Sequence, residues 1–569
     1  MIAPVVAYFS MEIALEPGIP TYAGGLGVLA GDSIRSAADL GLSLVAVSLV
    51  HRHGYFHQKL DASGAQSELD ASWKPEELLE PLAARVTVEI EGRSVALRAW
   101  RHRVRGVCGD EVPVYLLDAD LPENAEGDRE LTDRLYGGDA RYRLCQETLL
   151  GIGGVRMLRA LGHTQVDRFH LNEGHAALAV LALLEEELRP GAPADPGRAH
   201  EAVRRRCVFT THTPVPAGHD RFPNELVASV LGEAAQRRLE GLGQVQELNL
   251  TDLALRSVRF VNGVAMRHGE VSTRMFPQYP IRSITNGIHP ATWAAPAVRA
   301  LFDLHIREWR RDAQSLRYAV KIPLGEIWWA HSRAKRALLA RLEEAGAAGF
   351  REPAFTIGFA RRSTAYKRST LLFHDLARLR ALAQTHGPIQ LVFAGKAHPN
   401  DGEGKQMIRR IFEAGAALGG AIPVAYLPDY DMETARFLVS GCDLWLNNPV
   451  PPMEASGTSG MKAALNGVPS LSVLDGWWLE GHVEGITGWS IGSDGGVDAG
   501  QIHDRDAHDA DRLYQKLDQA VLPAFFAQRE RYLEVMRNAI ALNASFFNTQ
   551  RMLLQYLYAA YVEHGEDCR

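Results

Sequence analysis

Short apolar runs alternate with helix-like stretches along this chain, and that alternation most constrains its fold. A strand of a parallel sheet is buried on both faces, and a crossover, usually a helix, carries the chain to the next strand. In the first half, the expected strands are residues 5–9, 44–49, 112–117, 169–171 and 208–210. In the second half, they are residues 355–359, 391–393, 423–427, 444–446 and 470–474. The pattern predicts an α/β protein with doubly wound parallel sheets.

The length of 569 residues exceeds what one hydrophobic core usually organises, so we expect at least two domains. An Arg-, Ala- and Leu-rich, helix-like region at about 297–344 separates the two series of strands. We therefore predict one Rossmann-like domain over 1–295 and a second over 296–545. Residues 546–569 form a closing helix, with apolar positions at helical spacing that should dock on a core.

Composition excludes several classes of protein. A hydrophobic content of 46% with 23% charged residues is typical of a globular chain, and a net charge of −7 argues against a nucleic-acid binder. The most apolar stretch, residues 40–50, is too short for a membrane helix, and the N-terminus lacks the basic flank of a signal peptide. We expect a cytoplasmic protein with no membrane partner. Its scattered cysteines fit reduced thiols: Cys108, Cys145, Cys207, Cys442 and Cys568.

A small, polar, glycine-rich segment follows the expected strand at 444–446 and leads into a helix that we expect to start near Met461. The first turn of a helix leaves N–H groups unpaired and carries positive dipole, so it suits an anion. Glu454 at the entry suits a carboxylate that binds hydroxyl groups, and Lys462 places an amine one turn inside the helix. An ordinary α/β loop with a solvated lysine is the alternative, because glycine-rich turns are common.

The motif EASGTSGMK, residues 454–462, resembles the cofactor-lysine segment of the α-glucan (glycogen and maltodextrin) phosphorylases. In that family the lysine holds pyridoxal 5′-phosphate as a Schiff base, and the resemblance gives this role to Lys462. Larger family members usually carry Gly-Asn where this chain has Ser459-Gly460. The resemblance also implies cofactor contacts for Thr458 and Ser459. It implies sugar contacts for Glu454, Ala455, Ser456 and Gly457.

A second glycine-rich turn, TYAGGLGVLAGD at residues 21–32, enters another expected helix. Its spacing is not the dinucleotide-binding fingerprint, and a purely structural turn is the alternative. In the phosphorylases the matching loop gives backbone N–H groups to the substrate phosphate. The resemblance therefore implies this role for Gly24, Gly25 and Leu26, with Gly25 also near the cofactor. Starch and glycogen synthases have a comparable loop, so this motif does not separate the two families.

Two histidine-bearing motifs, FHLNEGH and FTTHTP, end expected strands. Neither has the His-Glu-x-x-His spacing that places two ligands on one helical face, so we expect no metal. Histidines of the core at strand ends are the alternative. The resemblance implies instead that His175 and His212 contact the bound glucose.

Two more motifs match the family. In TNGIHPATW, the resemblance implies that Asn286 binds the sugar and that Trp293 lies near the cofactor. In PDYDM, which takes the place of Asn-Tyr-Arg in larger members, Tyr430 is expected at the cofactor site. Asp431 reverses the charge of the family's arginine, so that arginine's role does not carry over to this chain.

The basic motif FARRSTAYKR, residues 359–368, follows a strand and opens an expected helix. A planar guanidinium and a compact ammonium near a helix N-terminus suit a dianion, whereas a solvated basic face is the alternative. The resemblance implies that Arg362 and Lys367 bind the substrate phosphate and that Arg361 lies near the cofactor phosphate. Synthases of the same fold also carry an Arg and a Lys here.

The sequence is thus identified as a member of the α-glucan phosphorylase family and resembles its compact bacterial and archaeal branch. This implies the GT-B glycosyltransferase architecture, with two Rossmann-like domains facing a cleft and the last helix, residues 546–569, crossing back to the N-terminal domain. It also implies α-1,4-glucan phosphorolysis, with retention, to α-glucose 1-phosphate. That branch lacks the long N-terminal extension of regulated members, so we expect no control by phosphorylation through such an extension. The residues expected to act in catalysis are Lys462, Arg362, Lys367, His212 and Glu454.

The expected cofactor is pyridoxal 5′-phosphate, and the expected partners are an α-1,4-glucan and inorganic phosphate, with self-association left open. Two alternatives remain. One is a nucleotide-sugar-dependent glucan synthase of the same fold, which needs no cofactor lysine. The other is a glucan-binding protein that has lost turnover, which the presence of Lys462, Arg362 and Lys367 disfavours.

Overall fold

The computed structural model describes residues 4–189, 195–215, 218–492 and 504–562, and the chain divides into two compact units. Unit 1 comprises Met1–Phe56, Asp70–Thr285 and Met552–Arg569, and unit 2 comprises His57–Leu69 and Asn286–Arg551. The boundaries thus fall at 285/286 and 551/552, whereas the sequence suggested 295/296 and 545/546. Residues 57–69 belong to unit 2 although segments of unit 1 flank them on both sides.

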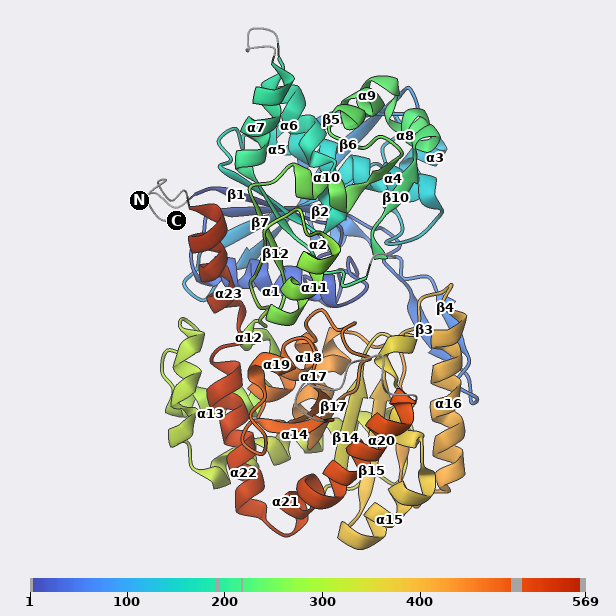
Figure 1. Cartoon of the computed structure of the whole chain (residues 1–569), viewed down its shortest axis with the longest axis vertical. Coiled ribbons are helices and arrows are strands. Elements are labelled where there is room, and N and C mark those ends of the chain that lie inside the picture. The colour runs from blue at the N-terminus through green and yellow to red at the C-terminus, as the bar shows by residue number, and fades with distance from the viewer. Residues whose placement is uncertain (1–3, 190–194, 216–217, 493–503, 563–569) are drawn as a thin grey trace. The chain divides into compact units, whose positions relative to one another are not determined.

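Unit 1 is built on a nine-stranded sheet in the order β13-β12-β9-β8-β1-β2-β7-β6-β5. Figure 1 labels β1, β2, β5, β6, β7 and β12 of this sheet. Pairing is parallel from β13 to β7 and antiparallel between β7, β6 and β5. The strands expected in this half are confirmed as β1, β2, β7, β8 and β9. The strands are β1 Val6–Ser10, β2 Leu44–Leu49, β5 Glu80–Ile90, β6 Arg93–Arg105, β7 Glu111–Asp118, β8 Arg168–Asn172, β9 Cys207–Thr210, β12 Phe260–Gly263 and β13 Ile281–Ser283, with a separate pair β10 Arg221–Pro223 and β11 Glu247–Asn249.

Helices surround this sheet, and the last of them comes from the end of the chain. Met552, Leu553 and Tyr556 of α23 (Thr549–Tyr556) lie in the same buried cluster as Tyr8 and Leu29, which confirms that the closing segment docks on a core. The other α-helices of unit 1 are α1 Gly25–Asp39, α2 Pro75–Leu78, α3 Glu126–Arg129, α4 Ala140–Thr148, α5 Gly154–Ala160, α6 Ala179–Glu187, α7 Pro196–Arg206, α8 Asn224–Leu231, α9 Glu233–Gly241, α10 Leu250–Arg256 and α11 Met266–Met275.

Unit 2 is built on a six-stranded, fully parallel sheet in the order β16-β15-β14-β17-β18-β19. All five strands expected in this half are confirmed, and β19 was not expected. The strands are β14 Phe355–Ala360, β15 Ile389–Ala394, β16 Val424–Leu427, β17 Leu444–Asn447, β18 Ser470–Val473 and β19 Gly488–Ile491. The α-helices are α12 Pro290–Trp293, α13 Pro296–His305, α14 Leu324–Glu344, α15 Leu376–His386, α16 Gly402–Leu418, α17 Met432–Gly441, α18 Thr458–Leu465, α19 Trp478–Gly481, α20 Arg505–Lys516, α21 Leu522–Phe526 and α22 Arg529–Asn538.

A hairpin from the early part of the chain, β3 (His57–Leu60) and β4 (Gln66–Leu69), attaches to this second sheet. The amide nitrogen of the Gln58 side chain donates to the Gly395 carbonyl at 2.9 Å, and that of Gln66 donates to the Ala397 carbonyl at 2.8 Å. The Asp429 carboxylate accepts from the Gln58 backbone N–H at 2.9 Å. Three buried or half-buried hydrogen bonds therefore hold the hairpin against the loops that follow β15 and β16.

The parallel strands bring the predicted site residues to one edge of each sheet. Ligands of open α/β sheets bind beyond the carboxyl ends of the strands. In unit 1 the motifs NEGH and HTP follow β8 and β9, and Ser10 at the end of β1 pairs with Asn172 at the end of β8. In unit 2 the RRSTAYK and EASGTSGMK motifs follow β14 and β17, which are neighbours in the sheet.

Two expectations about the chain's environment can be compared with the structure. Cys108, Cys145, Cys207 and Cys442 carry free thiols, and Cys568 lies outside the described residues. Among the described helices, none combines the length and the apolar character that crossing a bilayer requires.

Candidate active site

A buried carboxylate in unit 2 holds two cations at the carboxyl edge of the sheet. One Glu454 oxygen accepts from the Arg361 guanidinium at 2.7 Å and from the Lys367 ammonium at 2.6 Å. All three side chains are at most 10% exposed. Burial alone would raise the pKa of Glu454, but the charges of Arg361 and Lys367 outweigh it and hold that pKa below its usual value. The three groups therefore form a dry, charged cluster with one net positive charge.

The loops that carry this cluster are fastened to one another. Arg368 takes a left-handed conformation, with φ of 51°, and its guanidinium donates to the Asn448 carbonyl at 2.7 Å and the Pro449 carbonyl at 2.9 Å. In return, the Asn448 side chain donates to the Arg368 carbonyl at 2.7 Å. The backbone N–H of Glu454 donates to Asp475 at 2.9 Å. This second layer fixes the position of Glu454 relative to the two cations.

Lys462 lies on α18, which begins at Thr458, three residues earlier than the sequence suggested. Gly457 caps this helix with φ of 86°, a conformation that suits glycine. The Lys462 side chain is buried, and its ammonium lies 3.9 Å from the centre of the Trp293 ring. The structure thus brings the predicted cofactor lysine together with the tryptophan predicted to lie near the cofactor.

The donor groups around α18 suit a phosphate-bearing aldehyde. Two polar groups here are buried without a hydrogen-bond partner in the part of the chain that the structure describes: the Arg361 Nη1 and the Ser456 hydroxyl. The first turn of α18 adds unpaired backbone N–H groups. A primary amine, a guanidinium donor and a helix N-terminus are what pyridoxal phosphate needs, so these residues fit that group.

Three predicted residues of unit 2 lie outside the Glu454 cluster and the contact between Lys462 and Trp293. Arg362 is exposed and makes no ion pair within the described residues, in contrast to Arg361 and Lys367. The Ser459 hydroxyl accepts from the Trp445 indole at 3.2 Å, which ties α18 to β17. Asn286 is buried, and its side-chain oxygen has no partner among the described residues, so it can accept a hydrogen bond from a ligand.

Asp431, the charge reversal in the sequence, has a local structural role. Its side chain accepts from the Thr434 backbone N–H at 2.8 Å and so caps the N-terminus of α17. Tyr430, the preceding residue, is half-buried against the core of unit 2. The residue that departs from the family pattern is therefore a helix cap in this chain.

In unit 1 a buried glutamate organises the ends of β8 and β9. Glu173 takes a φ of 74° and accepts from the His212 backbone N–H at 2.7 Å and the Thr213 hydroxyl at 3.0 Å. Burial alone would raise the pKa of Glu173, but His212 and His175 lower it below its usual value. The His212 Nε2 lies 2.7 Å from the Asn172 side-chain oxygen, and burial lowers the pKa of His212 to about 4. His212 is therefore neutral near pH 7, with Nε2–H as donor.

The glycine-rich loop before α1 binds the side chain of an earlier residue, Glu12. The Glu12 carboxylate accepts from the backbone N–H groups of Ala23 at 2.6 Å and Gly24 at 3.1 Å. Helix α1 begins at Gly25, so the N–H groups of Gly25 and Leu26 lie in its first turn, where the helix supplies no acceptor. One of the three predicted phosphate donors, Gly24, is thus engaged by Glu12.

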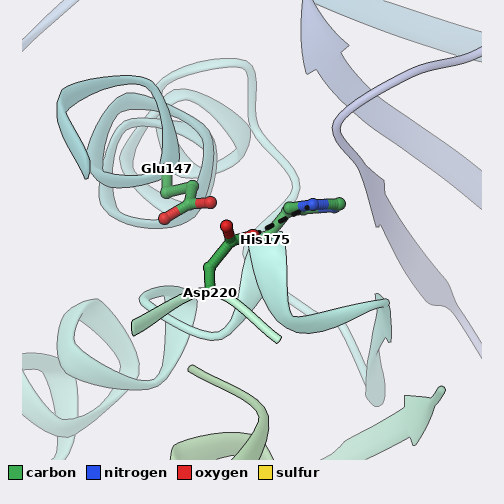
Figure 2. A group of neighbouring side chains, drawn as sticks. All are labelled: Glu147, His175 and Asp220. Atoms are coloured by element: carbon green, nitrogen blue, oxygen red, sulfur yellow. Dashed lines mark ion pairs between the residues drawn. The ribbon is translucent and has the colours of Figure 1, made fainter. Parts of the chain in front are cut away.

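His175 lies in a cluster that the sequence did not reveal. Its Nε2 is 3.3 Å from the Asp220 carboxylate, and Glu147 lies beside both (Figure 2). Glu147, Asp220 and Glu12 are separated from the motifs they support by loops or whole elements. Only Glu173, next to a strand end in the motif NEGH, carried a sequence signal, because polar residues at the ends of parallel strands point to a site.

Comparison with known proteins now adds to the geometry. Residues 233–487 match the family model described as carbohydrate phosphorylase. The chain is 40% identical to a maltodextrin phosphorylase of Thermococcus litoralis, over 97% of this chain and 70% of that protein. It is 39% identical to a glycogen phosphorylase of Mycobacterium tuberculosis, over 99% and 71%. It is 36% identical to a glycogen phosphorylase of Aquifex aeolicus, over 98% and 86%.

The two doubly wound sheets, one mostly parallel and one fully parallel, are those of a GT-B glycosyltransferase. The chain belongs to the carbohydrate phosphorylase family.

Proposed function

We infer that this protein is an α-1,4-glucan phosphorylase. It transfers the terminal glucosyl unit of a maltodextrin or glycogen chain to inorganic phosphate and yields α-glucose 1-phosphate with retention. The observation that carries this inference is the strand-to-helix segment after β17. Within residues 454–462 it presents a buried carboxylate that gathers two cations and a buried lysine amine beside an aromatic ring.

We propose that Lys462 holds pyridoxal 5′-phosphate through its amine, with the cofactor beside Trp293 and the first turn of α18. The unpartnered Arg361 Nη1 and the N–H groups of Thr458 and Ser459 would bind its phosphate. When bound, the cofactor supplies a phosphate group whose proton can be shared with an adjacent phosphate.

The substrate phosphate is a dianion near neutral pH, and Lys367 and Arg362 are the cations we assign to it. Lys367 is a buried point charge whose ammonium already binds one carboxylate oxygen. Arg362 is exposed in this structure, so its guanidinium is available to an incoming anion. Together these two side chains would orient phosphate for attack and oppose the charge that builds up during transfer.

The sugar-binding groups are neutral or anionic. A neutral His212 does not repel the positive charge that develops on the glucosyl carbon, and the unpartnered Asn286 oxygen can accept from a sugar hydroxyl. Glu454 stays ionised and can accept a further hydrogen bond through its second oxygen. No pair of carboxylates of the hydrolase type is needed, because phosphate replaces water as the acceptor.

Product analysis tests this function. The purified protein is incubated with maltodextrin and phosphate, and glucose 1-phosphate is measured, with ADP-glucose or UDP-glucose plus glucan offered in parallel. Phosphate-dependent release of glucose 1-phosphate is expected. Extension of glucan from a nucleotide sugar without phosphorolysis would identify a synthase instead, and release of free glucose would identify a hydrolase.

A further inference from the structure

Glu147 is a fully buried carboxyl group of unit 1 that the proposed reaction does not use. It lies on α4, one turn after Arg143, and its side chain is 0% exposed. Neither of its oxygens has a hydrogen-bond partner within the described ranges of the chain. An ionised carboxylate in such a place loses its hydration without gaining donors, which is strongly unfavourable. The surroundings of Glu147 must therefore account for its burial.

Those surroundings contain a second carboxylate and a single cation. Figure 2 shows the carboxyl group of Glu147 directed towards that of Asp220, and the ligand atoms of Glu147, His175 and Asp220 lie within 4.8 Å of one another. The Arg143 guanidinium lies 2.8 Å from an Asp220 oxygen and 3.8 Å from a Glu147 oxygen. One guanidinium balances only one of the two carboxylates.

His175 contacts the same Asp220 oxygen as Arg143. Its Nε2 lies 3.3 Å from that oxygen, and its Nδ1 is buried without a partner among the described residues. No described side chain donates a hydrogen bond to Glu147. A proton on Glu147 itself, shared with Asp220, relieves the contact between the two carboxyl groups.

We propose that Glu147 is a neutral carboxylic acid whose O–H donates to the Asp220 carboxylate, and that it thereby acts as a positioning residue for His175. The hydrogen bond holds Asp220 in place, and Asp220 orients the imidazole through Nε2–H. Burial raises the pKa of Glu147, and the charge of Asp220 raises it further, which agrees with this assignment. The consequence for sugar binding rests on the proposed glucose contact of His175, but the protonation of Glu147 does not.

The same three ligands could be taken for a divalent metal site, and the structure argues against it. The Arg143 guanidinium contacts Asp220 at 2.8 Å and lies 3.8 Å from Glu147, so a cation already faces both carboxyl groups. A cation among these groups would lie beside a fixed guanidinium, and its repulsion would offset the attraction of the carboxylates.

Infrared spectroscopy of the full chain at pH 8 tests the protonation directly. Asp133, whose pKa burial raises to about 6, is ionised at that pH. We expect the wild type to show the C=O band of a protonated carboxylic acid, shifted in D₂O and lost in Glu147→Gln. Absence of such a band, or its persistence in that variant, would overturn the assignment. Stoichiometric Mn²⁺ binding that Glu147→Gln abolishes would overturn it in favour of a metal site.

Two substitutions test the positioning role. Glu147→Gln keeps a donor towards Asp220 without charge, whereas Glu147→Leu keeps the volume and removes the donor. We expect the maltodextrin KM of the Gln variant to stay within about threefold of wild type and that of the Leu variant to rise about tenfold, the usual effect of one hydrogen bond. Equal loss in both variants would contradict the role, whereas inactivity of the wild type would contradict only the proposed function.

Discussion

Replacing Glu454 with glutamine should destabilise unit 2 in a way that phosphate reverses. The Glu454 carboxylate binds Arg361 and Lys367 at 2.7 and 2.6 Å, and all three side chains are nearly excluded from water. At an effective dielectric constant of about 20, each pair contributes about 6 kcal/mol of attraction, most of which desolvation offsets. The glutamine variant loses the attraction but keeps two buried cations, so we expect a loss of about 3–5 kcal/mol in unfolding free energy.

Calorimetry measures the effect. For a unit of this size the loss corresponds to a fall of about 6–10 °C in the unfolding midpoint. Phosphate at ten times its dissociation constant should restore about 1.4 kcal/mol to the variant, because an anion can take the place of the missing carboxylate. In the wild type, Glu454 already binds one nitrogen of Arg361 and the Lys367 ammonium, so the gain from phosphate should be smaller.

The matched control is Glu352→Gln, which removes an ion pair of 2.8 Å with Arg336 on the exposed surface of the same unit. Exposed pairs of this kind contribute at most about 1 kcal/mol, so its midpoint should change little and should not respond specifically to phosphate. The reasoning fails if Glu454→Gln is no more destabilising than the control. It also fails if phosphate stabilises wild type and Glu454→Gln equally.

Three further outcomes are expected. Lys462→Ala should lose both the absorbance of bound pyridoxal phosphate and phosphorolysis. The control variant Lys516→Ala, which breaks a surface ion pair with Glu484, should keep both. If Lys462→Ala retained covalently bound cofactor, Lys462 would not be the cofactor lysine. Asp431→Ala should lower the unfolding free energy by about 1 kcal/mol in urea through loss of the α17 cap, and Asp431→Asn by less; equal losses would argue against capping. Burial lowers the pKa of His212 from 6.5 to about 4, so the neutral side chain stabilises the folded state fully above pH 6.5 and this stabilisation is lost as pH falls through 4. His212→Asn should therefore weaken the pH dependence of the unfolding free energy between pH 6.5 and 4. An unchanged slope would show that His212 is not buried in its neutral form.

The strands predicted from sequence read as short apolar runs, and all ten are present. Most of them are buried on both faces, although β16 alternates between buried and half-buried positions, and the fully buried β12 and β19 were not predicted. The strands β5 and β6 were not predicted, because they form the antiparallel edge of the sheet. There the burial pattern alternates and arginines interrupt the apolar positions. The hairpin β3–β4 was not predicted for a different reason. Its buried contacts are hydrogen bonds to the loops after β15 and β16, which leave no apolar pattern in the sequence.

The site could be predicted only where its residues fall within a motif. The lysine and glutamate of EASGTSGMK, and the cations after β14, are local in sequence and were predicted as candidate site residues from their motifs. The ion pairs of Glu454 were not, because its partners lie 93 and 87 residues away and only the pairing of β14 with β17 brings them close. Glu147 offered no signal, because a single acid within a helix is ordinarily solvated.

The division of the chain into units also determines the order in which the parts of unit 1 are synthesised. The core of unit 1 includes Met552, Leu553 and Tyr556, so a ribosome that has finished residue 285 has made this unit without its last helix. The 266 residues of Asn286–Arg551 must be added first, which takes about 13–53 s at 5–20 residues per second. During that interval, the apolar surface around Tyr8 and Leu29 that α23 will cover is open to water and to chaperones. We therefore compare this protein with a permuted version in which α23 is fused ahead of β1. In a strain with fewer ribosome-associated chaperones, the aggregated fraction of the natural chain should exceed that of the permuted version.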